Sequence, residues 1–297
     1  MTQGIPELRK RGTSRAAAKV NLTLRVAGRR DDGLHELESL VVFSDIVDEL
    51  TLDAARPRAL ELHGPLRGEC GPPADNLVLK AAAALAARVF DLKIGHFTLI
   101  KRIPVAAGLG GGSADAAAAL RLLAEASGIP PDDHRLLDAA RATGADVAVC
   151  LDPRPRIMGG VGDRLSAPLA LPPLAAVLVN PGVALPTKAV FDAFHRAQPA
   201  YAAPAEPPSF ESFSKLLAYL RMRPNDLEAA AISLQPKIND VLSALLELPA
   251  CRLARMSGSG ATCFGLFETS EAASAAAQGL RAAHHGWWIE ETSLGAG

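Results

Sequence analysis

The segment IPVAAGLGGGSADAAAAL, residues 103–120, constrains this chain more than any other stretch. An apolar run ends there and an alanine-rich segment of high helix propensity begins. Four glycines separate the two, namely Gly108, Gly110, Gly111 and Gly112. Glycine lets the main chain turn sharply and direct several N–H groups inward. We expect Ser113 to be the N-cap of the following helix, whose free N–H groups carry about half a positive charge. Strand, glycine loop and helix in this order predict a phosphate site.

Other interpretations of this loop explain fewer of its residues. A simple hairpin turn needs only one or two glycines. The loop lacks the Lys-Ser/Thr pair of a Walker A motif. Its G-x-G-x-x-S spacing also differs from the G-x-G-x-x-G of a Rossmann fold. Taken alone, the loop indicates a phosphate-bearing ligand, with a nucleotide as the first choice.

Composition narrows the class of protein. The chain has 297 residues, of which 49% are hydrophobic and 21% charged, enough for one large or two ordinary domains. The net charge of −1 argues against a nucleic-acid or membrane-surface protein. The four cysteines, Cys70, Cys150, Cys251 and Cys263, have no metal-ligand spacing, so we expect free thiols in a reducing cytoplasm.

Neither end of the chain predicts a membrane segment. Residues 1–14 contain no apolar signal region and are expected to be a mobile basic tail. No apolar stretch reaches about 18 residues without a charge or a proline, so no membrane span is expected.

The first conspicuous strand runs from Lys19 to Val26, where apolar and polar residues alternate. This period of two predicts a half-buried strand with Lys19 and Asn21 on its polar face. The glycine-marked segment GRRDDGLHEL, residues 28–37, predicts a turn that carries His35. Two further apolar runs, residues 40–43 and 47–52, follow as separate strands.

The remaining pattern alternates helices and strands around a boundary near residue 160. The proline–alanine loop at 197–208 is expected to be either mobile or the edge of a lid. Helices are predicted at 76–90, 133–142, 211–220, 226–234, 237–247 and 270–285. A further helix is predicted to end at Phe191. Strands are predicted at 97–103, 175–180 and 286–292, with a turn and edge strand at 153–165.

Two further places can carry chemistry. Asp146 lies in an otherwise apolar setting, where a carboxylate is costly unless it is paired, functional or a helix cap. RMSGSGATCFGLF, residues 255–267, places Gly258 and Gly260 between two apolar runs, either as a tight hairpin or as a second functional loop.

Three stretches together carry a family resemblance: AAAKVNLTLRVAGRRDDGLHEL, IPVAAGLGGGSADAAAA and MSGSGATCFGLF. In content and order they resemble the three motifs of the GHMP kinase superfamily. K-x-N-L followed by G-R-R-x-D-G-x-H-E-L is the most specific part, and it is most similar to the branch whose substrate carries a diphosphocytidyl group. The resemblance covers about residues 17–290.

The resemblance implies an α+β fold of two domains. The first, residues 1–160, would be an ATP-binding domain similar to ribosomal protein S5. The second, residues 161–297, would be a ferredoxin-like substrate domain. The implied activity is ATP- and Mg²⁺-dependent phosphorylation of the 2-hydroxyl of a methylerythritol that carries the diphosphocytidyl group, in the non-mevalonate (MEP) pathway. No nucleic-acid or membrane partner is expected, and the implied oligomeric state is a monomer or weak homodimer.

The resemblance also assigns roles to residues. Lys19 and Asp146 would form the catalytic pair, with Asp146 taking the hydroxyl proton and Lys19 holding Asp146 ionised. Ser113 would be a ligand for magnesium or a phosphate oxygen. The ATP phosphates would be wrapped by Pro104, Val105, Ala106, Ala107, Gly108, Leu109, Gly110, Gly111, Gly112, Ser113 and Ala114.

The cytidine end of the substrate would be recognised by Asn21, His35 and Phe191, the last by stacking on the base. The family pattern G-Y-H reads G-Leu34-His35 here, which removes one aromatic stacking face. We therefore expect weaker or differently arranged cytidine binding with the same reaction.

Two alternatives stay open at this point. Another GHMP small-molecule kinase, such as a homoserine or mevalonate kinase, gives no reason for a base-reading histidine at position 35. A catalytically inactive nucleotide-binding regulator gives no reason to keep both Lys19 and Asp146.

Overall fold

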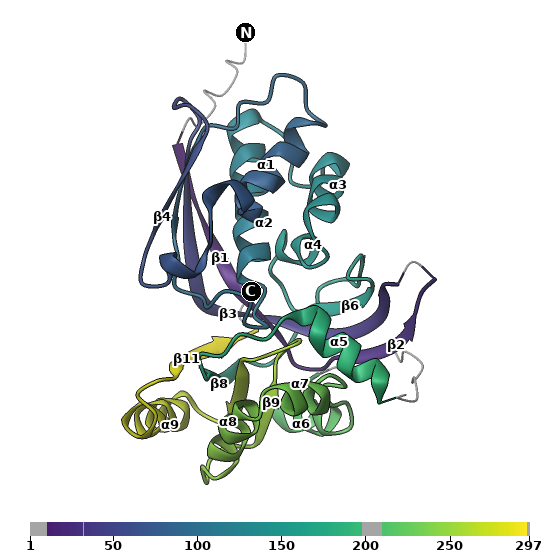
Figure 1. The fold of residues 1–297 in the computed structure, drawn as a ribbon, viewed down its shortest axis with the longest axis vertical. Helices are drawn as coiled ribbons and strands as arrows, with labels where there is room; N and C mark the ends of the chain where they lie inside the picture. Colours follow the sequence, from purple (N-terminus) through teal and green to yellow (C-terminus); the bar gives the residue numbers. More distant parts are fainter. Residues whose placement is uncertain (1–10, 32, 198–209, 296–297) are drawn as a thin grey trace. The chain divides into compact units, whose positions relative to one another are not determined.

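The computed structural model describes residues 11–31, 33–197 and 210–295 (Figure 1). The chain forms two compact units whose segments alternate along the sequence. Among the described residues, unit 1 contains those up to Ala16, Val47–Val105 and Gly111–Asp152; unit 2 contains Ala17–Ile46, Ala106–Gly110 and those from Pro153 onward. The domain boundary at residue 160 stays a prediction.

Unit 1 contains a small sheet built on the end of a long strand. β3 (His35–Asp53) ends in this unit, where Glu49–Asp53 pairs antiparallel with β5 (His96–Ile100). β4 (Ala59–His63) continues the sheet parallel to β5. β1 (Arg11–Asn21) begins here, and an ion pair of 2.9 Å joins Arg11 to Asp53.

Helices cover this sheet with largely small side chains. α1 (Leu77–Ala86) packs on α2 (Gly111–Ser127) and α3 (His134–Thr143), and α4 (Val147–Cys150) packs on α2. Two short 3₁₀ turns, η1 (Arg67–Glu69) and η2 (Pro73–Asp75), precede α1. Asn76 and Asp133 cap α1 and α3 by accepting the amides of Val78 and Arg135, as the sequence predicted for these helix starts.

Unit 2 combines two antiparallel arrangements. The first half of β3 pairs with β2 (Arg25–Arg29) and with β6 (Arg156–Gly160), which in turn pairs with β7 (Arg164–Leu165). The second arrangement has the order β11–β8–β10–β9, with Leu294 of β11 opposite Ser44 of β3. Its strands are β8 (Leu174–Asn180), β9 (Leu253–Met256), β10 (Cys263–Phe267) and β11 (Trp288–Leu294).

The described residues of unit 2 contain five helices. α9 packs on β8 and β11, whereas α8 packs on β9 and β10 (Figure 1). Val177, Ile238 and Leu245 are among the buried residues of the core between them. The five helices are α5 (Thr187–Arg196), α6 (Phe213–Arg221), α7 (Glu228–Leu234), α8 (Lys237–Leu246) and α9 (Ser270–Ala283).

Three predictions about the first strands are wrong. Residues 11–14 belong to β1 rather than to a mobile tail, of which residues 1–10 lie outside the described range. The strand predicted at 19–26 is two strands, because the backbone around residues 22–24 bonds elsewhere: Leu22 N to Leu40 O and Leu24 N to Pro224 O. The runs 40–43 and 47–52 are one strand.

The polar residues between those two runs stay in β3 because their polar groups have partners. Ser44 Oγ donates to Ile46 O at 3.1 Å, and Asp45 accepts from the Thr292 hydroxyl and the Ser293 amide. The predicted helices of residues 211–247 and the helix from Ser270 are confirmed, although α1 ends at Ala86 rather than near residue 90. Most of the loop predicted at 197–208 lies outside the described residues. Among those described, no helix is both long and apolar enough to cross a membrane.

Candidate active site

Lys19 lies near the end of β1 and is only 3% exposed. Its Nζ donates to Asn21 Oδ1 at 3.0 Å. Its backbone N–H donates to Leu109 O at 2.8 Å, which joins this strand to the glycine loop. A buried ammonium must be held by acceptors to offset its lost hydration. Although Lys19 lies on the polar face predicted for this strand, it is therefore a buried, oriented cation.

The amide of Asn21 is held from both sides. Its Nδ2 donates to Ser39 Oγ at 2.7 Å, and Ser39 Oγ donates to Thr23 O at 2.5 Å. Since the ammonium can only donate, the Asn21 oxygen must face Lys19. Asn21 thus positions Lys19, and its predicted contact with cytidine stays a prediction.

Residues 106–110 are the part of the glycine loop that belongs to unit 2. Gly108 is the position in this part that most strictly requires glycine. Gly108 has φ +78°, and a Cβ on it would lie 2.3 Å from Ser257 O. Gly110 has φ +61°, and its Cβ would lie 3.1 Å from Lys19 Cε. The main chain therefore passes close to both Lys19 and the segment around Ser257.

The third motif connects β9 to β10 and is bonded to the other two. Ser257 Oγ donates to Gly108 O at 2.9 Å and accepts from Asn21 N at 3.0 Å. Thr262 N donates to Ala107 O at 3.1 Å. The hairpin interpretation of Gly258 and Gly260 is thus right about the connection but incomplete. Three segments far apart in sequence meet within unit 2. Sequence reasoning missed Ser257, whose side chain joins them, and Ser39, which holds Asn21 within the first segment.

The other part of the loop, in unit 1, begins a helix earlier than predicted. α2 starts at Gly111, so Ser113 is its third residue and not its N-cap. The cause is Gly110, whose positive φ ends the loop immediately before the helix. Within unit 1, Gly112 is exposed and Ser113 half-buried, whereas Ala114 is buried and Val105 N donates to Glu69 Oε2.

Below this helix start lies a buried charge cluster: Asp48, Lys101 and Asp115. Lys101 Nζ lies 2.5 Å from Asp48 Oδ2 and 2.7 Å from Asp115 Oδ2. Asp48 Oδ1 also accepts the amides of Arg102 and Ile103. Asp115 Oδ1 has no hydrogen-bond partner among the described residues.

The cluster carries two acids for one base. Burial raises the pKa of Asp115 to about 7, against the opposing effect of Lys101. Burial works against the ammonium, yet Asp115 and Asp48 together raise the pKa of Lys101. Sequence reasoning missed this cluster, although Asp115 stands in an alanine-rich segment just as Asp146 stands in an apolar one.

Asp146, in unit 1, is half-buried and immediately precedes α4. Its side chain makes no capping hydrogen bond to that helix. The interpretation of Asp146 as a cap of α4 is therefore wrong, and its catalytic role stays a prediction.

Predicted cytidine-binding residues come together in unit 2. His35 begins β3, and its ring stacks on Phe191 of α5, with ring centroids 4.3 Å apart and planes 17° apart. A third ring, His195 of α5, contacts His35 through the Nε2 atoms. Burial and then His195 lower the pKa of His35. Leu34 is 51% exposed beside these rings in sequence.

Among the described residues, no group of three or more His, Cys, Asp or Glu side chains could hold a metal ion. Magnesium bound with a nucleotide takes most of its ligands from phosphates and water, so it needs no such group. Ser113, half-buried in the first turn of α2, is compatible with that kind of site.

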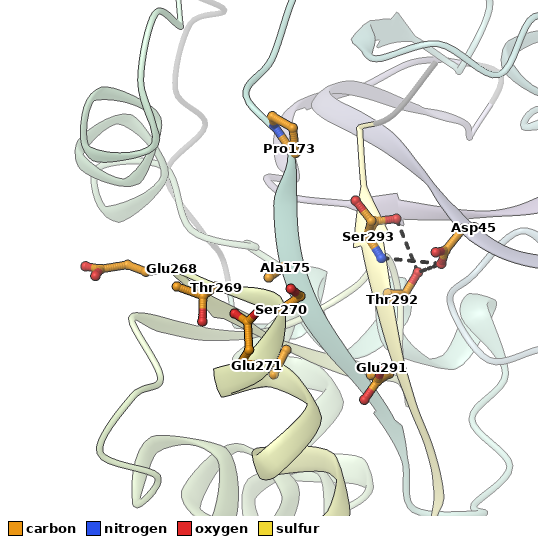
Figure 2. Close-up of a pocket in the computed structure, with 11 residues that line it drawn as sticks. Asp45, Pro173, Ala175, Glu268, Thr269, Ser270, Glu271, Glu291, Thr292 and Ser293 are labelled. Atoms are coloured by element: carbon orange, nitrogen blue, oxygen red, sulfur yellow. Dashed lines mark hydrogen bonds between the residues drawn. The ribbon is translucent and has the colours of Figure 1, made fainter.

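A separate cavity of about 510 Å³ lies elsewhere in unit 2, between the start of α9 and β11 (Figure 2). Its lining includes Asp45, Glu268, Glu271 and Glu291 and none of the motif residues. Because four carboxylates repel phosphates, this cavity is not the candidate nucleotide site.

The comparisons with known proteins agree with this arrangement of motifs. The family models "GHMP kinases N terminal domain" and "GHMP kinases C terminal" match residues 76–153 and 201–286. The chain thus has the two-domain α+β fold of a GHMP kinase.

Similar proteins of known name indicate the branch of the GHMP kinases to which this chain belongs. A 4-diphosphocytidyl-2-C-methyl-D-erythritol kinase of Xanthobacter autotrophicus is 53% identical over 95% of this chain and 98% of its own. The kinase of the same name from Methylobacterium radiotolerans is 55% identical over 94% of this chain and 98% of its own. A crystal structure of 4-(cytidine 5'-diphospho)-2C-methyl-D-erythritol kinase superposes with a TM-score of 0.74 at 35% identity, covering 96% of this chain and 100% of that one. This chain belongs to the family of 4-diphosphocytidyl-2-C-methyl-D-erythritol kinases within the GHMP kinases.

Proposed function

We propose that this chain transfers the γ-phosphoryl group of ATP to the 2-hydroxyl of 4-diphosphocytidyl-2-C-methyl-D-erythritol, in the MEP pathway to isoprenoid precursors. The observation that carries the proposal is the bonding of three motifs in unit 2, in which Asn21 and Gly108 both contact Ser257. The high identity to kinases of that name supports the choice of substrate.

Residues 104–114 would bind the ATP phosphates. Phosphoryl transfer depends on in-line positioning and on neutralising charge more than on covalent help. The first turn of α2 contains Gly111 and Gly112, whose N–H groups have no partner within the helix, and the helix adds its positive end. Glycines in the preceding loop let the backbone approach those phosphates closely.

Asp146 would take the proton of the 2-hydroxyl as the new phosphorus–oxygen bond forms and the bond to ADP breaks. A positioned base contributes about 10²- to 10⁴-fold to such a step. Lys19, held by Asn21, would keep Asp146 ionised and steady the hydroxyl. Its burial supports this role, since a buried cation exerts a stronger field than a solvated one.

Ser113 would hold Mg²⁺ or a phosphate oxygen through its hydroxyl. When bound, Mg²⁺ would neutralise charge on the ATP phosphates. His35 and Phe191 would recognise the cytidine end, together with Asn21.

We further propose a cytoplasmic enzyme that acts as a monomer or weak homodimer without a nucleic-acid or membrane partner. The net charge of −1 supports the part of this proposal that excludes a nucleic-acid or membrane-surface partner. Light scattering after gel filtration measures the oligomeric state.

The decisive assay measures ATP consumption by the purified chain with magnesium and 4-diphosphocytidyl-2-C-methyl-D-erythritol. Homoserine and mevalonate serve as control substrates. Turnover with the cytidine compound alone is the expected result. Turnover with a control substrate alone would assign another GHMP kinase activity. ATP binding without any turnover would indicate a nucleotide-binding regulator.

Asp146→Asn tests the base directly. We expect it to bind ATP normally while turnover falls by about 10²-fold or more, because the amide cannot accept the proton. Isothermal titration with ATP and steady-state kinetics measure the two effects separately. A near-normal turnover number would remove Asp146 from the role of base.

A further inference from the structure

His195 contacts His35, one of the proposed cytidine-recognition residues, but has no role in the proposed function. It lies four residues after Phe191 on α5, so both side chains belong to the same face of the helix. Phe191 stacks on one face of the His35 ring, and His195 reaches the Nε2 edge of that ring. His35 is therefore held by two side chains of one helix.

The contact between the two imidazoles is edge to edge. Their planes are 23° apart and their centroids 4.6 Å apart, a spacing that on its own resembles stacking. However, the two Nε2 atoms are hydrogen-bonded to each other, and ring nitrogens donate and accept in the plane of the ring. The rings therefore meet through their nitrogens, while Phe191 supplies the stacked face.

An N–H···N bond between neutral imidazoles imposes complementary tautomers. One ring carries its proton on Nε2 and donates, and the other carries it on Nδ1 and accepts. As Nε2 of His35 is engaged with His195, Nδ1 is the ring nitrogen that a base edge can use. Its character as donor or acceptor is thus coupled to the tautomer of His195.

We propose that His195 is a positioning residue of the cytidine site: it fixes the ring plane and tautomer of His35, and so selects which hydrogen-bonding role His35 presents to the cytosine edge. The proposal rests on the proposed function, because cytosine is the base to be read. Cytosine offers an amino donor beside a ring-nitrogen acceptor, so a histidine with a defined tautomer discriminates better than one that interconverts.

The charges around His35 favour its neutral form. Besides burial and His195, Arg29 of β2 lowers the pKa of His35, while Asp192 of α5 raises it. A neutral His35 ring carries one proton, so it has a tautomer that a hydrogen bond to His195 can fix.

The tautomers can be measured without substrate. Long-range ¹H–¹⁵N spectra of the full chain, labelled at histidine, separate Nδ1–H, Nε2–H and doubly protonated rings. We expect His35 and His195 to show single, complementary tautomers at pH 8. In His195→Phe, which keeps a ring but no nitrogen, His35 should show an averaged mixture. Averaged shifts for His35 in the unsubstituted chain would overturn the proposal directly, whether or not the variant folds.

Kinetics provide the second readout. His195→Phe should raise the KM for the cytidine substrate about 3- to 10-fold, the effect of losing one net hydrogen bond, while kcat and the KM for ATP change less than about twofold. His195→Gln, which can still donate or accept, should recover part of the loss. His284→Phe is the control, because His284 contacts an aromatic ring away from the cytidine residues, that of Trp287, with ring centroids 3.7 Å apart.

The outcomes separate the proposal from the proposed function. Normal turnover by the unsubstituted chain with an unchanged KM in His195→Phe would overturn the role of His195 alone. Complementary tautomers without any turnover of the cytidine substrate would overturn the proposed function, and the ring pair would then be purely structural. Equal changes in both KM values would likewise indicate a structural role.

Discussion

Replacing Lys101 by methionine removes the one cation from the buried cluster of unit 1. Lys101 is 1% exposed, and its two partners, Asp48 and Asp115, are 0% and 1% exposed. Methionine preserves most of the side-chain volume, so the change isolates the charge. Two carboxylates would then share a buried site, and like charges in such a site cannot both stay ionised.

The size of the effect follows from these contacts. Removing one partner of a buried ion pair costs about 3–5 kcal/mol, because the remaining charge is left without compensation. Asp48 keeps two backbone amides as donors, so Asp115 is the acid that takes up a proton. At about 2–4 °C per kcal/mol, the melting temperature should fall on the order of 10 °C. The loss should be larger at pH 8 than at pH 6, because uptake of that proton becomes costlier.

Urea unfolding followed by circular dichroism measures this loss, with Lys215→Met as the control. Lys215 forms an exposed ion pair with Glu211, which is worth less than about 1 kcal/mol. Equal stabilities for the two variants would refute the inference that the buried cluster depends on the Lys101 charge.

The other predictions concern single groups. The pKa of the Asp115 carboxyl is raised from 3.8 to about 7, so its contribution to the free energy of unfolding is complete below about pH 4 and is lost as the pH rises through 7. Asp115→Asn should therefore make the urea midpoint depend less on pH. Gly108→Ala should lower kcat/KM for ATP by at least tenfold, owing to its +78° φ and the 2.3 Å approach to Ser257 O. Gly279→Ala should stabilise α9 by about 0.5–1 kcal/mol, because a Cβ at this position meets no other atom. Thermal melts should therefore show a higher melting temperature for Gly279→Ala than for Gly108→Ala. Leu34→Tyr should lower the KM for the cytidine substrate, since a base–aromatic stack is worth roughly 1–3 kcal/mol. An unchanged KM would mean that residue 34 does not face the base.

Many helix starts could be predicted because the residues that determine them are close in sequence. Asn76 and Asp133 are side chains that cap helices through amides two residues away, so the signal lies within a few positions. The start of α2 was missed by three residues because Gly110, and not the cap-like Ser113, ends the loop. Both residues fit the sequence pattern, and only the backbone φ distinguishes them.

Burial of charge could not be predicted in the same way. Lys19 reads as a lysine on an amphipathic strand, since its cover comes from Leu109 and Asn21 in a fold that the alternation does not specify. Asp48 and Lys101 are separated by 53 residues, so their pairing is a tertiary fact. A single sequence shows that such a residue is unusual in its surroundings but not which partner offsets its charge.

The cytidine residues fall between these two cases. His35 and Phe191 were predicted from the family resemblance, whereas His195 was missed. A local signal was nevertheless present, because the predicted helix ended at Phe191 while α5 continues to Arg196 and brings His195 to the same face. Extending that helix by one turn would have placed a second imidazole beside the predicted stacking residue. In this chain, therefore, the length of one helix decides whether His35 contacts Phe191 alone or is also hydrogen-bonded to His195.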